Sequence, residues 1–271
     1  MSALIHNSSS ITFNHDTRLV RRSTRTNPQV IASAGPCNFA ADSLTYKVAE
    51  TRSERQKAFH LVYDVYRQAG LMSENASKMR VTKHHLLETT DVLIARKESD
   101  VLFTISSIRD GAYGLPLEQI FPDEVDAMRG EGLNLAEVSC VASKVPTSSK
   151  KLRFEILVKM MSIMAQQAQR NRVDRLLLAV HPRHAKVYQR LFGCKILSGE
   201  KSYAAVEDNP AVLCSHDFAE LEIERYPLYD AIQGPSYDPW QLAGTRMSDD
   251  ELEYFADALN QGTENLVPMA A

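Results

Sequence analysis

The order of apolar and polar positions predicts strands and helices that alternate along the chain from about residue 44. Apolar or alternating runs predict strands at 44–49, 91–96, 101–109, 134–142, 175–180, 195–197, 203–206 and 212–214. Apolar positions at helical spacing predict a first helix that begins at a cap, Thr51 or Ser53, and ends near Gly70. The same spacing predicts helices at 124–129, 150–170 and 182–193, and from 248 onward. This order predicts an α/β (α+β) fold with a mixed central sheet and helices on its faces.

Composition divides the chain into three parts. Residues 1–42 are rich in Ser, Thr, Asn and Arg and hold only two acids, Asp16 and Asp42, which favours a disordered leader over an organellar transit peptide. Residues 43–216 hold nearly all the predicted strands and helices, and we expect them to form one domain. We expect residues 217–271 to form a C-terminal helical extension that packs on the domain or on a partner.

Charge and cysteine spacing argue against several classes of protein. The chain has 31 Lys and Arg against 34 Asp and Glu, a net charge of −3, so no overall field favours nucleic acid. No apolar run approaches the roughly 20 residues of a membrane helix, and the N-terminus lacks the apolar segment of a secretory signal. The four cysteines are far apart and lack zinc-type spacing, which favours reduced thiols in a cytoplasm and predicts no metal site.

Glu137 is the most unusual residue of the predicted strands, because it stands in the middle of an apolar one. A buried carboxylate costs several kcal/mol unless it is paired, hydrated or functional. The structural alternative is that strand alternation turns Glu137 toward solvent and a basic side chain. Its neighbours Leu135, Ala136 and Val138 are apolar, which favours a functional carboxylate that takes a proton from an attacking amine.

The start of the long helix at 150–170 is a candidate phosphate site. Free backbone N–H groups and the helix dipole favour an anion there, and four side chains add donors. These side chains are Ser148, Ser149, Lys150 and Lys151. The structural alternative is an N-cap at Ser149 followed by an ordinary basic surface turn.

Three further groups have both a chemical and a structural interpretation. Tyr188 is a candidate proton donor to a thiolate leaving group, or a buried packing residue. Cys140 is a candidate nucleophile, or a small buried hydrophobic side chain. His181 and His184 lack a third metal ligand, so surface histidines are favoured over a metal site.

Several segments together resemble the GNAT acyltransferase superfamily and, more narrowly, the N-acyl amino acid synthases of the FeeM type and their autoinducer-synthase-like relatives. The narrower resemblance rests on GLPLEQIF at 114–121, DAMR at 126–129 and LAEVS at 135–139. The sequence HPRH at 181–184 and the Y-x-x-x-F-G pattern at 188–193 reinforce it. The resemblance spans roughly residues 44–214 and implies a GNAT-type, mostly antiparallel sheet with helices on both faces.

This resemblance implies an enzyme that moves a long-chain acyl group from an acyl carrier protein thioester to the α-amine of an amino acid. Glu137 would be the base and Tyr188 the group that reprotonates the thiol. The backbone of Cys140, Val141 and Ala142 would pair the amides of the donor's phosphopantetheine arm. No metal and no tightly bound cofactor are implied, and the donor substrate is acyl-phosphopantetheine on the carrier protein or acyl-CoA.

The superfamily's glycine-containing phosphate loop is missing, since residues 147–153 contain no glycine. This departure makes a close backbone approach to a pyrophosphate doubtful and favours an acyl carrier protein donor over free coenzyme A. Carrier proteins are acidic, and a basic rim for docking one is formed by Lys144, Lys150, Lys151 and Arg153. The structural alternative is an ordinary solvated helix face.

The polar loop at 72–87 is where we expect contacts to the carboxylate of the amino-acid acceptor, since an anion requires cations or oriented amides. The candidate residues are Arg80, Lys83, His84 and His85. Side chains expected to line an acyl pocket are Phe103, Ile105, Leu157 and Met161. These expectations describe a cytoplasmic, bacterial enzyme without a transmembrane segment, whose lipid-like product implies peripheral membrane contact.

Three other functions remain open at this point. An acetyl-CoA-dependent N-acetyltransferase would have a small acyl pocket, and the glycine-free loop speaks against it. A non-catalytic GNAT-like binding module would tolerate replacement of Glu137. A homoserine-lactone synthase shares the fold and the donor but takes S-adenosylmethionine, and no segment here matches its N-terminal Arg/Trp-rich signature.

Overall fold

The computed structural model describes residues 39–263, with side chains through 261, and its centre is one eight-stranded sheet. The strand order is β1-β2-β3-β4-β5-β8-β6, and β7 pairs with β8 outside this path. All pairs are antiparallel except β4 with β5, so the predicted mixed, mostly antiparallel sheet is confirmed. The strands are β1 (Thr45–Val48), β2 (Thr90–Lys97), β3 (Asp100–Arg109), β4 (Leu135–Ser143), β5 (Arg175–Val180), β6 (Lys195–Ile196), β7 (Lys201–Tyr203) and β8 (Asn209–Asp217).

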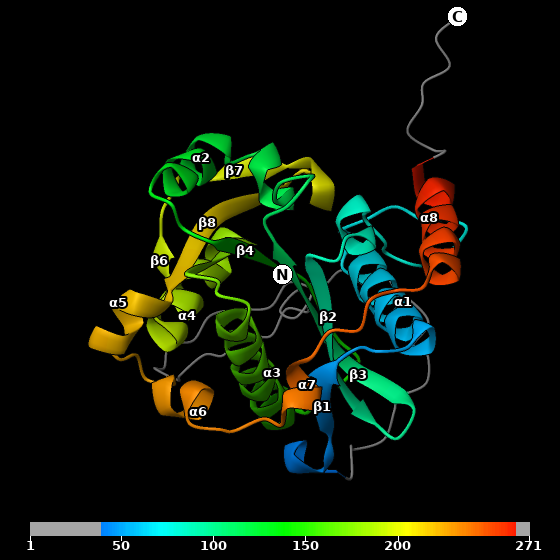
Figure 1. The fold of residues 1–271 in the computed structure, drawn as a ribbon, viewed down its shortest axis with the longest axis horizontal. Helices are drawn as coiled ribbons and strands as arrows, with labels where there is room; N and C mark the ends of the chain where they lie inside the picture. Colours follow the sequence, from blue (N-terminus) through cyan, green and yellow to red (C-terminus); the bar gives the residue numbers. More distant parts are fainter. Residues whose placement is uncertain (1–38, 264–271) are drawn as a thin grey trace, which may run out of the picture.

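Helices cover both faces of this sheet, as predicted (Figure 1). The α-helices are α1 (Arg52–Gln68), α2 (Pro122–Gly130), α3 (Lys150–Arg170), α4 (Pro182–Phe192), α5 (Phe218–Ile223), α6 (Tyr229–Gln233), α7 (Pro239–Leu242) and α8 (Asp249–Thr263). The 3-10 helices are η2 (Ala41–Ser43), η3 (Lys83–Leu86), η4 (Pro116–Gln119) and η5 (Ala204–Val206). Apolar residues of α3 and α4 pack with Ala136 and Val138 on one face of β4, whereas those of α1 pack with Cys140 and Ala142 on the other.

The parallel strands β4 and β5 separate soon after they begin. Their register runs only from Leu135 opposite Arg175 to Glu137 opposite Leu177. Between Ser139 and Ala142, β4 also has one residue more than β3, which is a β-bulge, and Cys140 in this bulge has a φ of 51°. A bulge bends and twists its strand, so β4 turns away from β5 and the sheet opens directly after Glu137.

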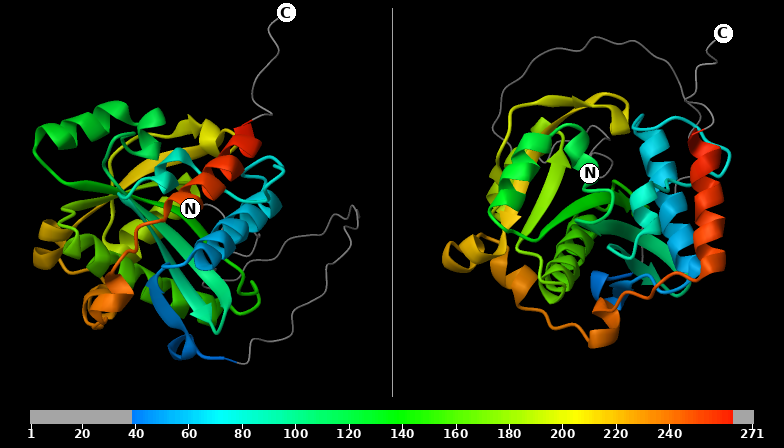
Figure 2. Two further views of the ribbon diagram at one scale, coloured as in Figure 1. Left: turned by 45° about the vertical axis from the view of Figure 1, so that its right-hand side comes forward. Right: turned by 45° about the horizontal axis from the view of Figure 1, so that its top comes forward.

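The C-terminal extension wraps around the domain. Figures 1 and 2 show that it leaves β8 and runs along α3, where it forms α6 and α7. It then crosses the β1 edge of the sheet and ends as α8 beside α1. Among the contacts along this path, Gln166 donates to the Pro235 carbonyl at 2.6 Å, and the rings of Phe59 and Phe255 lie 5.1 Å apart. The extension therefore packs on the domain, which is one of the two arrangements expected from the sequence.

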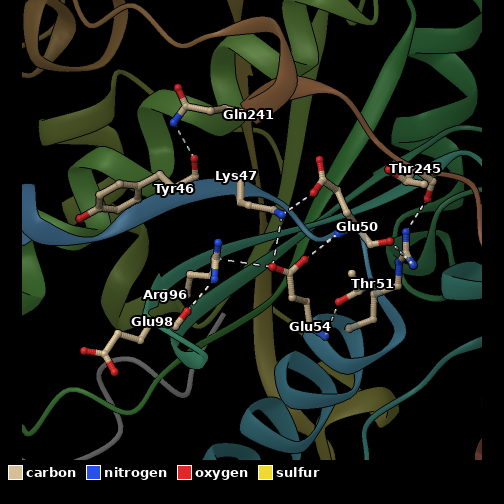
Figure 3. Close-up of polar contacts among 10 residues, drawn as sticks. Tyr46, Lys47, Glu50, Thr51, Glu54, Arg96, Glu98, Gln241 and Thr245 are labelled. Carbon is tan, nitrogen blue, oxygen red and sulfur yellow. Dashed lines mark hydrogen bonds and ion pairs between the residues drawn. The ribbon is translucent and has the colours of Figure 1, made fainter.

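Hydrogen bonds between side chains and backbone carbonyls hold the extension where it crosses β1 (Figure 3). Gln241 donates to the Tyr46 carbonyl at 2.8 Å, and the buried Arg55 donates to the Thr245 carbonyl and to Glu251 at 2.8 Å. Edge strands carry unpaired backbone groups, and a covering segment keeps other chains from pairing with them. The extension therefore protects the free edge of β1.

A buried lysine links β1 to the start of α1. Lys47 is 4% exposed, and its Nζ lies 2.6 Å from a Glu50 oxygen and 3.2 Å from a Glu54 oxygen (Figure 3). Of the two predicted caps, Thr51 is the N-cap, since its side chain accepts from the Glu54 N–H at 3.2 Å. The Glu54 side chain in turn accepts from the Glu50 N–H, one residue before the N-cap.

The sequence prediction was wrong at 204–206, where a strand was expected and η5 is found. Glu207 and Asp208 follow with φ values of 54° and 57°, so the chain reverses tightly before β8 and leaves no length for a longer β7. The irregular segment 71–90 contains η3, and a 3-10 helix, η4, stands in the predicted excursion before β4. Most of the predicted leader, residues 1–38, lies outside the described residues.

Candidate active site

Glu137 lies at the point where β4 and β5 separate, and its side chain is 2% exposed. Its Oε2 accepts a hydrogen bond of 2.7 Å from the backbone N–H of Leu117. Burial raises the pKa of the Glu137 carboxyl to about 8, against the lowering effect of hydrogen bonds from Leu117 and Ser139. A carboxyl with this pKa exchanges its proton near neutral pH, as a general base in catalysis requires.

The loop that brings Leu117 to Glu137 is held by Arg129 of α2. Its guanidinium bonds Asp110 at 2.6 and 2.9 Å and also pairs with Glu118. Pro116 begins η4, which turns the Leu117 N–H toward β4. The three segments that carry the narrow family resemblance, 114–121, 126–129 and 135–139, therefore meet around the Glu137 carboxylate.

Two tyrosines that sequence analysis did not single out as site residues lie near Glu137. Burial raises the pKa of both Tyr66 in α1 and Tyr203 in β7, and the charge of Glu137 raises each further. In the sequence, Tyr66 belongs to the apolar stripe of a helix and Tyr203 to a short predicted strand. No signal in the sequence distinguishes either from an ordinary core tyrosine.

Arg80 approaches the same group from the segment that precedes η3. Its guanidinium carbon lies 5.0 Å from the centre of the Tyr66 ring, and Nη2 donates to the Ala205 carbonyl at 2.8 Å. Its Nε is buried and has no hydrogen-bond partner among residues 39–261. Arg80 is therefore a predicted acceptor residue that contacts Tyr66 and has a donor to spare.

The other three predicted acceptor residues are divided between two places. His85 is 1% exposed and its Nε2 lies 3.1 Å from the Ser106 hydroxyl of β3, on the Glu137 side. Lys83 lies over the ring of Tyr113, 4.9 Å from its centre, and the His84 ring packs edge-on against the same tyrosine. Only Arg80 and His85 of this set extend toward the carboxylate.

Tyr188 lies in α4 on the sheet face opposite Glu137 and is 3% exposed. It lines an apolar cavity of about 30 Å³ between the sheet, α3 and α4, together with Val138, Met161 and Met164. Burial raises the pKa of the Tyr188 phenol, so the group is protonated at neutral pH. Of the predicted pocket residues, Met161 lines this cavity, whereas Phe103 and Ile105 belong to the closed core.

The predicted arm-binding residues Cys140, Val141 and Ala142 are buried and stand in or next to the bulge. Their strand has no register with β5 beyond Glu137, so the side of β4 that faces β5 offers backbone groups to a ligand within the described fold. The Cys140 side chain belongs to the apolar cluster beneath α1.

The start of α3 is polar and largely exposed. Ser149 is the N-cap but makes no side-chain capping bond, and Ser148, Lys150 and Lys151 are exposed. Lys144 is paired with Asp100 at 2.5 Å, and burial lowers the pKa of the half-buried Arg153. The helix therefore presents its first-turn lysines to solvent at the open side of the sheet.

Neither a metal site nor a membrane helix is found in the part of the chain that the structure describes. The His181 and His184 rings are 5.8 Å apart, and no group of three or more His, Cys, Asp or Glu side chains is placed to hold a metal ion among residues 39–261. Within the described elements, none of the helices has the length and apolarity needed to cross a membrane.

An antiparallel sheet opened between two parallel central strands, with helices on both faces, is the architecture of GNAT-like acyltransferases. Residues 57–217 match the family model described as N-acyl amino acid synthase FeeM. This match spans more than half of the chain, so the protein belongs to the FeeM family of N-acyl amino acid synthases and is an acyltransferase.

Solved structures with the same fold share little sequence with the chain. FeeM, an N-acyl amino acid synthase from uncultured soil microbes, is 24% identical and matches 69% of this chain and 97% of its own, with a TM-score of 0.59. The AHL synthase LasI is 13% identical over 72% of this chain and 96% of its own, with a TM-score of 0.51. BjaI, a CoA-dependent acyl-homoserine lactone synthase, is 14% identical over 78% of this chain and 99% of its own, with a TM-score of 0.50. No curated protein matches the chain.

Proposed function

We propose that this acyltransferase moves an acyl group from the thioester of an acyl carrier protein to the α-amine of an amino acid, with Glu137 as the base. The observation that carries the proposal is a buried carboxyl with a pKa raised to about 8, placed where β4 and β5 separate. In this proposal the catalytic domain comprises residues 43–216, and residues 217–271 are its C-terminal extension.

The proposed reaction begins when the neutral amine attacks the thioester carbonyl and forms a carbon–nitrogen bond. Glu137 takes the proton that the amine loses, and the tetrahedral intermediate collapses with cleavage of the carbon–sulfur bond. Tyr188 supplies a proton to the departing thiolate, which leaves as the phosphopantetheine thiol, and the proton taken up by Glu137 returns through solvent to the Tyr188 phenolate. The products are an N-acyl amino acid and a carrier protein with a free thiol.

The acceptor carboxylate is assigned to Arg80. Its Nε is buried without a partner among the described residues, and the charges of both Arg80 and Glu137 act on Tyr66 and Tyr203. A guanidinium recognises a carboxylate through charge-assisted hydrogen bonds. An amino acid held by its carboxylate at Arg80 would present its α-amine toward Glu137.

The carrier protein is assigned to the exposed start of α3. Lys150 and Lys151 are exposed there, and the preceding turn has no glycine through which a backbone could approach a pyrophosphate closely. An acidic carrier protein presents one phosphodiester and complements these charges. Lys144 and Arg153 contribute less to docking in this proposal, because Lys144 is paired with Asp100 and Arg153 is half-buried.

The cavity beside Tyr188 supports a second candidate, an acetyl-CoA-dependent N-acetyltransferase. Its volume of about 30 Å³ holds little more than one water, which suits a very small acyl group. A long chain would enter only if Met161 and Met164 changed rotamer, and methionine is the apolar side chain that does so most readily. Donor length therefore separates the two candidates.

The experiment compares donors on the purified protein. Long-chain acyl carrier protein, the matching acyl-CoA and acetyl-CoA are each offered with a mixture of amino acids, and products are identified by mass spectrometry. The proposal expects N-acyl amino acids from the long-chain carrier protein at a higher rate than from the acyl-CoA. Turnover of acetyl-CoA alone would reject the long-chain donor and support the N-acetyltransferase.

A further inference from the structure

The C-terminal extension contributes a side chain to the apolar cavity between the sheet, α3 and α4. Three elements that line this cavity supply Val138 from β4, Met161 and Met164 from α3, and Ile232 from α6 of the extension. The family match ends at residue 217, and of the described residues that line the cavity Ile232 is the one beyond it. The cavity therefore has a wall that the family-matched segment does not supply.

Hydrogen bonds to α3 and within α6 hold Ile232 at this wall. The Ser162 hydroxyl of α3 donates to the Ile232 carbonyl, and the Ile232 N–H donates to the Leu228 carbonyl at 3.0 Å. Just after α6, Gln166 donates to the Pro235 carbonyl at 2.6 Å. The Ile232 side chain is 2% exposed, and α6 cannot move away from α3 without breaking these bonds.

The side chains that line the cavity differ in how readily they move. Met161 and Met164 are unbranched and have three rotatable bonds each, so they change rotamer easily. Ile232 is branched at Cβ, which restricts its χ1 angle, and its backbone is fixed by hydrogen bonds. An acyl chain that displaces the methionines therefore stops at Ile232.

The order of the layers places Ile232 on the outer side of the cavity. The sheet opens directly after Glu137, and Val138, the next residue of β4, lines the cavity on the sheet side. The helix α6 packs on α3 at the periphery of the domain (Figure 1). A chain that enters from the opening in the sheet therefore passes Val138 before it reaches Ile232.

We propose that Ile232 sets the length of the acyl chain that the enzyme transfers, so that the C-terminal extension is part of the donor site. The proposal rests on the proposed function, because it takes this cavity as the place of the acyl chain. Ile232→Ala removes three carbon atoms, and at the packing density of a protein interior their space suits about two to three methylene groups. Each methylene that a pocket can bury changes kcat/KM by about four- to tenfold.

The extension provides a matched control for this substitution. Leu221 of α5 is 8% exposed and belongs to the same apolar cluster as Ile232, but it does not line the cavity. Leu221→Ala and Ile232→Ala remove the same number of carbon atoms from buried positions, and only the second enlarges the cavity. Ile232→Val removes one carbon atom and keeps the branched side chain, which makes it a milder variant that is expected to fold.

The measurement is kcat/KM for a series of acyl carrier protein donors whose chains differ by two carbons, with the unfolding free energy of each variant as a check on folding. The chain that Ile232→Ala prefers should be two carbons longer than the chain that the wild type prefers. The ratio of kcat/KM for these two donors should change by about 10- to 100-fold. Ile232→Val should change it in the same direction by less, and Leu221→Ala should keep the wild-type preference.

A second readout does not depend on turnover. The 13C-methyl NMR signals of Met161 and Met164 are followed while fatty acids of the same series are added to methionine-labelled protein. The longest fatty acid that shifts these signals should be two carbons longer for Ile232→Ala than for the wild type or Leu221→Ala.

The same preference for chain length in Ile232→Ala and Leu221→Ala would overturn the proposal, as would methionine signals that no fatty acid shifts. If the wild type forms no N-acyl product, the proposed function fails, but the NMR titration still decides whether Ile232 limits the cavity. If the wild type is active and Ile232→Ala changes neither the preference nor the titration, the role of Ile232 fails and the proposed function stands.

Discussion

Glu137→Gln should be more stable than the wild type, by a margin that grows as the pH rises, and it should lose activity. The pKa of the Glu137 carboxyl is about 8 in the folded protein against an ordinary value of 4.5, so the folded state binds this proton more tightly than the unfolded chain. The stability contributed by the protonated carboxyl is fully present below pH 4.5 and is lost as the pH rises through 8. A glutamine cannot ionise, and its amide oxygen can still accept the Leu117 N–H.

The magnitude follows from the difference between the two pKa values. One pKa unit corresponds to 1.36 kcal/mol, so the full effect at high pH is about 5 kcal/mol and the change between pH 5 and pH 7 is about 2 to 3 kcal/mol. For a protein of this size that change shifts the midpoint of thermal unfolding by about 5 to 10 °C.

The assay is urea unfolding of the wild type and Glu137→Gln, followed by far-ultraviolet circular dichroism at pH 5, 6, 7 and 8. All other titrating groups are shared, so they cancel in the difference between the two proteins. The advantage of Glu137→Gln should grow steadily over this range. A difference in unfolding free energy that is the same at pH 5 and pH 7 would refute the raised pKa and with it the argument for a base poised near neutrality.

Three further changes test other parts of the account. Arg80→Gln should raise the KM for the amino acid about 10- to 100-fold with a smaller effect on kcat, because one charge-assisted contact is lost; steady-state kinetics would contradict this if only kcat fell. Lys150→Glu with Lys151→Glu should raise the KM for acyl carrier protein about two- to tenfold, most strongly at low salt, and leave the KM for acyl-CoA nearly unchanged; equal effects on both donors would rule out carrier docking at α3. Phe255→Ala, at a fully buried ring on Phe59, should lower the unfolding free energy by about 3–5 kcal/mol, and a loss below 1 kcal/mol would show that the extension is not anchored there.

The local parts of the fold were predictable from the sequence because their signals lie within a few residues. Thr51 with Glu54 marked the start of α1, and Gly193, with a φ of 67°, ended α4 where predicted. Glu137 stood out because a carboxylate in an apolar strand has to be explained. Each of these conclusions depends on neighbours in the chain.

The parts that were not predictable depend on contacts between distant segments. The approach of Arg80 to Tyr66 and Tyr203 depends on how the segment before η3 lies over the sheet, which no periodicity reports. The path of the extension across β1 depends on individual hydrogen bonds such as that of Arg55 to the Thr245 carbonyl, 190 residues away in the chain. The bulge at Cys140 has no sequence signal, since residues other than glycine seldom adopt a φ of 51°.

The most direct test of the account is the rate at which purified wild type and Glu137→Gln convert long-chain acyl carrier protein and an amino acid into N-acyl amino acid in a single turnover. Loss of a general base lowers such a rate by about 10²- to 10⁴-fold, and this is the loss we predict for Glu137→Gln, with donor binding unchanged. Product formation by Glu137→Gln at the wild-type rate would contradict the assignment of Glu137 as the base.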